Sequence, residues 1–165
     1  MRLILILLFG IMFIAPATSQ NYTRDAGFRF GSFPSFSYRQ FEDETSAFEL
    51  MISGSWRKIR FTVLREYFSP AFMQFSDNIS FVYGYGAHVG MMYSNEYKLL
   101  FRTYQLDEWK LSPGFGLDAL LGFEYNLGDL PIVIGMDFKP FFEFSTTRIF
   151  YIFLDDASFS LKYKF

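Results

Sequence analysis

The sequence has 165 residues, a formal net charge of −2, and 51% hydrophobic and 22% aromatic residues, with 24 Phe and 11 Tyr. This length suits one domain, and the slightly acidic balance gives no basic surface for nucleic acid. The sequence contains no cysteine, which excludes disulfides, thiolate metal sites and a thiol nucleophile.

The N-terminal segment, residues 1–19, is predicted to be a secretory signal peptide. Arg2 precedes an apolar run from Leu3 to Ala15, and the small residues Ala17 and Ser19 stand where a cleavage site needs them. The apolar run is short for a transmembrane helix, which needs about 20 residues. We therefore expect export, cleavage after Ser19, and one domain over residues 20–165.

The rest of the chain is dominated by alternation of apolar and polar residues, the period of a half-buried β-strand. Eight strands are expected, at residues 25–30, 35–41, 45–52, 57–67, 79–91, 114–126, 131–142 and 158–165. Residues 93–111 show no clear alternation and are interpreted as a loop. Residues 147–154 are apolar and could extend the neighbouring strands.

The lengths of the connections favour a closed barrel. With an even number of strands both termini lie at one end, and the connections over 92–113, 145–156 and the short 53–55 lie at the other. Short turns at one rim and long loops at the other are typical of outer-membrane barrels. The connection over residues 68–77 is long for a turn at the terminal rim.

Alternation alone is compatible with two barrels, because a soluble lipocalin-like barrel has its apolar side inward and a membrane barrel has it outward. Eight strands rich in Phe, Tyr and Leu would overfill a narrow interior. Aromatic residues also stand near strand ends, where a membrane barrel has its girdles: Trp56, Tyr67, Tyr93, Tyr125 and Phe165. We predict an all-β, eight-stranded antiparallel up-and-down transmembrane β-barrel, with a secreted soluble barrel as the alternative.

The polar faces of the predicted strands combine glycines with charges of both signs. Their ionisable residues are Arg29, Arg39, Glu49, Lys58, Arg60, Glu66, His88, Asp118, Glu124, Asp137, Lys139, Glu143, Lys162 and Lys164. Buried charges need partners, and an eight-stranded barrel is just wide enough for side chains to fill it. We expect these residues to form an interior network that plugs the barrel; a narrow channel is the alternative.

Four motifs carry a resemblance to a known class: G-F-R-F-G at 27–31, Y-G-Y-G-A-H-V-G at 83–90, G-L-D-A-L-L-G-F-E-Y at 116–125 and P-I-V-I-G-M-D-F-K-P at 131–140. In pattern and motifs the chain resembles the small eight-stranded outer-membrane barrels that include the OmpA transmembrane domain and OmpX. It resembles uncharacterised barrel proteins of the Bacteroidetes more closely. The resemblance implies a fold and a place in a Gram-negative outer membrane; it implies no activity.

Two features of the sequence are candidates for a cofactor or catalytic site. The run G-Y-G-A-H-V-G at residues 84–90 lacks the spacing and the following helix of a nucleotide-binding loop. His88, the only histidine, cannot build a histidine-rich metal site. It could act as a general base beside Asp118 or Glu124, so a lipid-modifying hydrolase remains an alternative to the expected non-enzymatic, cofactor-free protein.

In the last predicted strand, residues 158–165, apolar and polar residues alternate at every position. Phe159, Leu161, Tyr163 and Phe165 form its apolar face and resemble the C-terminal signal that the barrel-assembly machinery recognises. The expected partners are outer-membrane lipid, that machinery, and a protein bound through the aromatic and charged outer loop at residues 95–110, since aromatic residues and Arg favour interfaces. The expected role is structural or accessory.

Overall fold

The computed structural model describes residues 23–71, 78–99, 102–128, 130–146 and 150–165, with the backbone alone over 94–108. The predicted signal peptide lies outside the described residues. Within them the structure is all-β, and no helix is long and apolar enough to cross a membrane.

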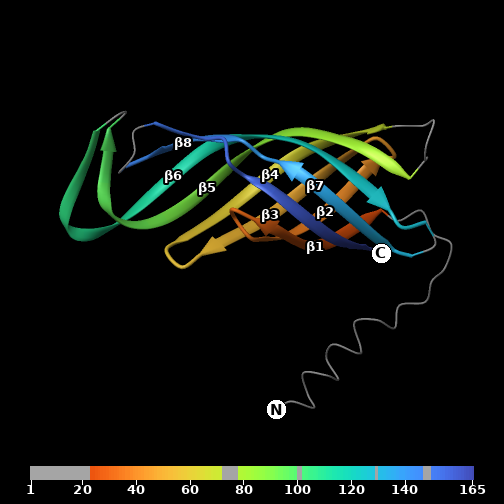
Figure 1. Cartoon of the computed structure of the whole chain (residues 1–165), viewed down its shortest axis with the longest axis horizontal. Helices are drawn as coiled ribbons and strands as arrows, with labels where there is room; N and C mark the ends of the chain where they lie inside the picture. The colour runs from red at the N-terminus through yellow and green to blue at the C-terminus, as the bar shows by residue number, and fades with distance from the viewer. Residues whose placement is uncertain (1–22, 72–77, 100–101, 129, 147–149) are drawn as a thin grey trace, which may run out of the picture.

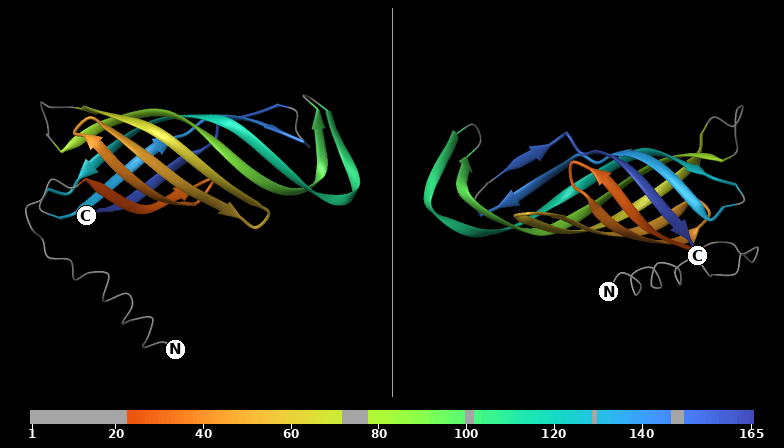
Figure 2. Two further views of the ribbon diagram at one scale, coloured as in Figure 1. Left: turned by 180° about the vertical axis from the view of Figure 1, so that it is seen from behind. Right: turned by 60° about the horizontal axis from the view of Figure 1, so that its bottom comes forward.

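The described chain forms ten strands. They are β1 (Arg24–Gly31), β2 (Ser35–Asp43), β3 (Ser46–Ser55), β4 (Lys58–Pro70), β5 (Ile79–Leu99), β6 (Arg102–Asn126), β7 (Ile132–Phe138), β8 (Phe141–Ser145), β9 (Tyr151–Phe153) and β10 (Ala157–Lys164). Every pairing is antiparallel, and β10 pairs with both β1 and β7. β8 continues β7, and β9 leads into β10. The ten strands therefore form the eight wall segments, called staves below, of a closed, strongly tilted barrel (Figures 1 and 2).

The two ends of the barrel differ. The terminal rim holds the start of β1 and the end of β10, where the Phe165 N–H donates to the Arg24 carbonyl (3.0 Å). The hairpin rim holds the β3–β4 turn and the β5–β6 hairpin, which continues past the barrel and bends away from its axis (Figure 1). The long extension therefore lies at the rim opposite the termini, as predicted, although the short β3–β4 turn lies at that rim too.

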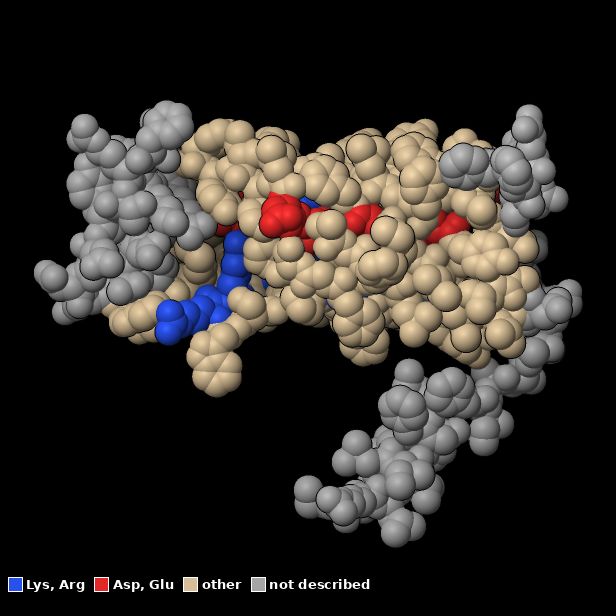
Figure 3. All heavy atoms as spheres, in the orientation of Figure 1, with Lys and Arg blue, Asp and Glu red and all other residues tan. Residues whose placement is uncertain are grey.

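Burial along each strand is the reverse of that in a water-soluble barrel. Outward-facing Phe30 and Phe159 are 57% and 58% exposed, while inward-facing Arg29 is 2% exposed. Most of the described surface in Figure 3 is uncharged. The soluble lipocalin-like alternative, which requires the apolar side inward, is therefore wrong.

Glycines make room for the large inward side chains. A Cβ at Gly116 would stand 2.6 Å from the ring of His88 and 2.0 Å from the Phe142 carbonyl oxygen. A Cβ at Gly135 would lie 2.4 Å from the hydroxyl of Ser160, and 3.2 Å from the side chain of Glu124. The glycines of the polar faces therefore provide volume for charged groups and for a close neighbouring strand.

The prediction of a loop over residues 93–111 is wrong. β5 and β6 continue as a paired hairpin, from Tyr93↔Leu111 to Leu99↔Arg102, with a bulge between Ser94 and Glu96. Backbone pairing alone needs no amphipathic pattern, and alternation marks a strand only where one of its faces is buried. Beyond the last barrel pair of β5, Lys58↔Met92, the described backbone of the hairpin pairs only with itself, and the alternating pattern in the sequence is absent there.

The prediction of one strand over residues 131–142 is also wrong, because the stave is interrupted at Lys139 and Pro140. Pro140 has no N–H to donate; its carbonyl accepts from Ala119 (2.9 Å), and the Lys139 N–H donates to the Asp156 carbonyl (2.8 Å). Within the apolar segment 147–154, residues Tyr151–Phe153 form β9, which pairs with β8.

Candidate functional site

The inner side of the barrel holds every ionisable residue predicted for it. Eleven are buried: Arg29, Arg39, Glu49, Arg60, Glu66, His88, Asp118, Glu124, Lys139, Glu143 and Lys162. Lys58, Asp137 and Lys164 are half-buried. Sequence reasoning missed Asp25 and Asp156, which are fully buried among the same cations.

Arg39 organises the group of charges nearest the terminal rim. Its Nε and Nη2 donate to Asp25 Oδ2 (3.0 and 2.6 Å). Nη1 donates to Glu66 (3.1 Å), and Nη1 and Nη2 donate to the two oxygens of Glu124 (both 2.9 Å). One guanidinium on β2 thus ties together β1, β4 and β6, using donors that a lysine does not have.

Lys162 on β10 extends this group across the lumen. Its Nζ lies 3.2 Å from Glu124 and 2.8 Å from Glu49; the latter ion pair falls outside hydrogen-bond geometry. The Arg39 guanidinium also lies between two inward-facing rings, 5.0 Å from the centroid of Phe41 and 4.9 Å from that of Phe68. The rings cover the charges at the mouth of the barrel.

The middle group forms where the last two staves are interrupted. Arg29 donates to Asp137 through Nε (2.7 Å) and Nη2 (2.5 Å), and to Asp156 Oδ1 (3.0 Å). Lys139 Nζ donates to Asp118 (2.9 Å) and lies 3.5 Å from Asp156. The backbone irregularity therefore brings one further carboxylate, Asp156, between two cations.

His88 belongs to the group nearest the hairpin rim. Its Nδ1 lies 2.6 Å from Asp118, and its Nε2 lies 3.2 Å from Glu143. Arg60 donates to the same Glu143 carboxylate (3.1 Å) and Lys58 lies 3.6 Å from it. Both ring nitrogens are held by carboxylates, so neither is placed to activate a serine hydroxyl, and this geometry does not favour the hydrolase alternative.

Apolar side chains share the interior with these charges. Met51, Leu64, Val82 and Leu120 form a buried cluster. Val82 and Leu120 are apolar residues at inward positions of otherwise polar faces, a signal that the sequence already contained. Phe33, Phe141 and Phe153 pack together near the hairpin rim, with ring centroids 5.2 to 5.9 Å apart.

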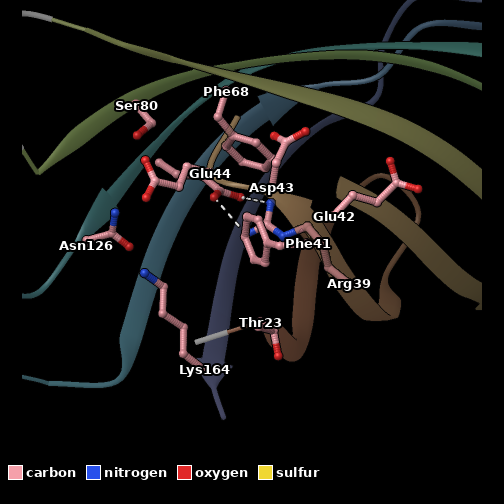
Figure 4. A pocket seen from close by; sticks show the side chains of 11 residues that line it. Thr23, Arg39, Phe41, Glu42, Asp43, Glu44, Phe68, Ser80, Asn126 and Lys164 are labelled. Atoms are coloured by element: carbon pink, nitrogen blue, oxygen red, sulfur yellow. Dashed lines mark hydrogen bonds and ion pairs between the residues drawn. The ribbon is translucent and has the colours of Figure 1, made fainter. Parts of the chain in front are cut away.

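Little space remains between these groups. A void of about 10 Å³ lies among residues that include Arg29, Glu66 and Lys162, no larger than one water molecule needs. A larger hollow of about 450 Å³ opens at the terminal rim. Figure 4 shows its lining, with the amine of Lys164 pointing toward Asn126. Lys164 makes no ion pair with a residue that the structure describes. Among the described residues no cluster of His, Cys, Asp or Glu could hold a metal ion.

A closed antiparallel barrel of eight staves, charged inside and apolar outside, defines the class of small up-and-down β-barrels. The chain is similar to a solved member, the crystal structure of the N-terminal β-barrel domain of Pseudomonas aeruginosa OprF, with a TM-score of 0.59, 8% identity, and coverage of 86% of this chain and 95% of that one. At this identity the likeness shows the fold alone, and the predicted eight-stranded antiparallel barrel is confirmed. Neither a protein-family model nor a curated protein matches the sequence. The closer resemblance to Bacteroidetes proteins stays a prediction.

Proposed function

We propose that the protein spans an outer membrane as a β-barrel with a structural or accessory role. The observation that carries this proposal is the reversed burial of the wall, where Leu161 is 52% exposed while its neighbour Lys162 is 5% exposed. An apolar surface of this extent is too large for a soluble monomer. Lipid would cover it, and closure of the barrel satisfies the backbone groups that lipid cannot.

Aromatic side chains at both rims support this placement. Tyr67 and Tyr83 stack near the terminal rim, with centroids 5.5 Å apart, and Tyr93 and Trp109 stack near the hairpin rim at the same distance. Tyr and Trp prefer the level of lipid headgroups, where one end of the ring is wet. The two aromatic pairs would lie at the two membrane–water interfaces, with the hairpin rim at the external one.

The charged interior is proposed to be a plug. Ion pairs cross the lumen between strands that are not neighbours, such as Arg39 on β2 with Glu124 on β6 (2.9 Å). A conducting path would require these pairs to separate in a poorly hydrated space, which is costly. Planar-bilayer recordings of the purified barrel should therefore show no conductance above background; a stable open level would support the channel alternative.

The accessory role is assigned to the projecting hairpin. The last barrel pairs at the hairpin rim are Lys58↔Met92 for β5 and Gly114↔Ser145 for β6, and the hairpin continues to Leu99 and Arg102. This extension would stand outside the membrane, where it can contact a protein partner. Replacing residues 95–108 by a short turn should leave the barrel folded and abolish co-purification of that partner from native membranes.

The location has a direct test. The protein should sediment with outer membranes, require detergent for extraction, and migrate differently on a gel before and after boiling, as a closed barrel does. If it stays in the supernatant after high-speed centrifugation without detergent, the proposal fails. No catalytic step is proposed, because the one histidine is held within the ionic network.

A further inference from the structure

One side of the apolar wall is hollowed near the hairpin rim. A groove of about 560 Å³ runs over β4, β5, β6 and β8. Its apolar lining includes Ile59, Phe61, Val89, Met91, Phe115 and Phe144. The groove crosses the outward-facing row Ile59↔Met91↔Pro113. The short, rigid ring of Pro113 leaves space on the β6 side of this row.

A second apolar hollow, of about 450 Å³, continues the groove toward the terminal rim. The residues Phe115↔Phe144 border the first hollow and the next outward pair, Leu117↔Phe142, borders the second. The small side chain of Ala119 and the interruption of the stave at Pro140 open this second space. Two hollows thus follow one another along the same strands.

A cation lies at the rim next to the groove. Arg57 stands in the β3–β4 turn, two residues before Ile59, and its carbonyl accepts from the Tyr93 N–H (2.9 Å), one step beyond the pair Lys58↔Met92. The Arg57 guanidinium lies 4.2 Å from the ring centroid of Trp109, which stacks on Tyr93. Arg57 is exposed and makes no ion pair with any residue that the structure describes.

The described part of the opposite rim has no equivalent arrangement. Arg65, the outward arginine on the same strand, is paired with Glu42 and also covers the ring of Phe48. Arg24 is exposed at the start of β1, a strand that contributes no residue to either apolar hollow, whereas β4 beside Arg57 contributes Ile59 and Phe61. Among the described residues, a guanidinium without an ion pair, resting on an aromatic ring beside an apolar groove, therefore occurs only at the hairpin rim.

We propose that this wall binds a phosphorylated acyl glycolipid of the outer leaflet, with its acyl chains in the two hollows and a phosphate on Arg57. The proposal rests on the proposed membrane placement, with the hairpin rim outward. Arginine binds phosphate through charge-assisted, often bidentate hydrogen bonds, and Tyr93 and Trp109 hold the level of the headgroups. Two consecutive hollows on one wall fit a lipid with several chains better than one with a single chain.

The test is a titration of the purified, detergent-solubilised full-length barrel with lipid A, read by native mass spectrometry. We expect a one-to-one complex that Arg57→Gln weakens about tenfold, the loss of one charge-assisted contact. Arg24→Gln, the same change at the opposite rim, should leave binding unchanged. Val89→Phe fills the groove and should weaken binding several-fold, whereas Val63→Phe, outside both hollows on the same wall, should not.

Three results would overturn the proposal: equal losses for Arg57→Gln and Arg24→Gln, equal losses for Val89→Phe and Val63→Phe, or phosphatidylglycerol binding as tightly as lipid A. The heat-dependent gel shift establishes that each variant is folded. If Val89→Phe does not fold, the comparison of Arg57→Gln with Arg24→Gln tests the proposal by itself. The titration uses purified protein, so it is independent of membrane fractionation. A negative titration would overturn lipid binding, while the proposed location would still be tested by fractionation.

Discussion

At the scale of single residues, the interior depends most on Arg39. This side chain is 1% exposed and donates to three carboxylates on three other strands. A buried ion pair adds little net stability when complete, because its charges lose their hydration. Removing one partner is different, since the remaining charges stay buried without compensation.

Arg39→Gln should therefore lower the free energy of unfolding by about 3–5 kcal/mol, the range for a broken buried pair. Urea titrations in detergent, followed by the gel shift of the folded band, measure this loss. Arg65→Gln is the matched control, because Arg65 lies on the outer side of β4 and is paired with the exposed Glu42. A loss for Arg65→Gln as large as that for Arg39→Gln would contradict the assigned role.

Asp43, the exposed last residue of β2 before the turn to β3, carries a pH-dependent contribution to stability. Hydrogen bonds from the Ser46 hydroxyl (2.8 Å), the Thr45 hydroxyl (2.8 Å) and the Thr45 N–H (2.7 Å) lower the pKa of its carboxyl from 3.8 to about 2. Because this pKa is lower in the folded state, the charged form stabilises the fold above pH 3.8, and the contribution is lost as the pH falls toward 2.

Asp43→Asn removes this titration. The difference in urea midpoint between the wild type and Asp43→Asn should be constant above pH 3.8 and shrink as the pH approaches 2. Parallel midpoint curves over the whole range would show that the three hydrogen bonds do not stabilise the carboxylate.

Alternation placed most inward charges correctly, because a period of two assigns each residue to one face wherever a strand lines a barrel. It did not identify Asp25 and Asp156. Asp25 stands on the polar face of β1, and its importance appears only when the register brings it to Arg39. Asp156 lies between β9 and β10, in a stretch without regular pairing, so no pattern indicates its direction.

At the scale of strands, the predictions hold where outward-facing and lumen-facing sides alternate. They fail in the β5–β6 hairpin beyond the barrel and at the break between β7 and β8. Beyond the barrel the described backbone of β5 and β6 pairs only within the hairpin, and the break depends on contacts across the barrel, such as the Lys139 N–H to the Asp156 carbonyl (2.8 Å). Neither cause is local in the sequence.

The strand β10 carries the predicted assembly signal. Phe165 follows β10, donates its N–H to the Arg24 carbonyl (3.0 Å) and lies 6.4 Å from the ring of Tyr38. If the assembly machinery recognises this end, deleting Phe165 should lower the amount of assembled barrel much more than it lowers the stability of the barrels that form. Quantifying the heat-modifiable band in membranes, and its urea midpoint after extraction, separates the two effects.

Phe30→Ala is the control for this deletion. Phe30 is also an outward aromatic residue, 57% exposed, but it lies at the other end of β1 and outside the proposed signal. Its yield should match that of the wild type. Equal yields for the Phe165 deletion and the wild type would remove the assembly role.

At the scale of the whole molecule, closure and reversed burial follow from the same alternating sequence. β10 pairs with β1 over seven residue pairs, from Asp25↔Lys164 to Gly31↔Ser158, so the wall has no free edge there. The sequence could predict this architecture because every stave repeats one rule. It could not indicate a role, because interior pairing and an apolar wall are common to all such barrels, whereas the groove beside Arg57 depends on the register of four strands, β4, β5, β6 and β8.

The two tryptophans test the placement of the whole barrel in a membrane. Trp56 lies in the β3–β4 turn and Trp109 on the projecting hairpin, both at the hairpin rim. In vesicles, their fluorescence should be quenched more by lipids labelled near the headgroup than by lipids labelled near the bilayer centre, because that rim would sit at the interface. Leu161→Trp in a Trp56→Phe, Trp109→Phe background places the probe on the outward-facing side of β10, and the preference should reverse. If lipids labelled near the bilayer centre quench the native tryptophans more than they quench this probe, the proposed position of the wall is contradicted.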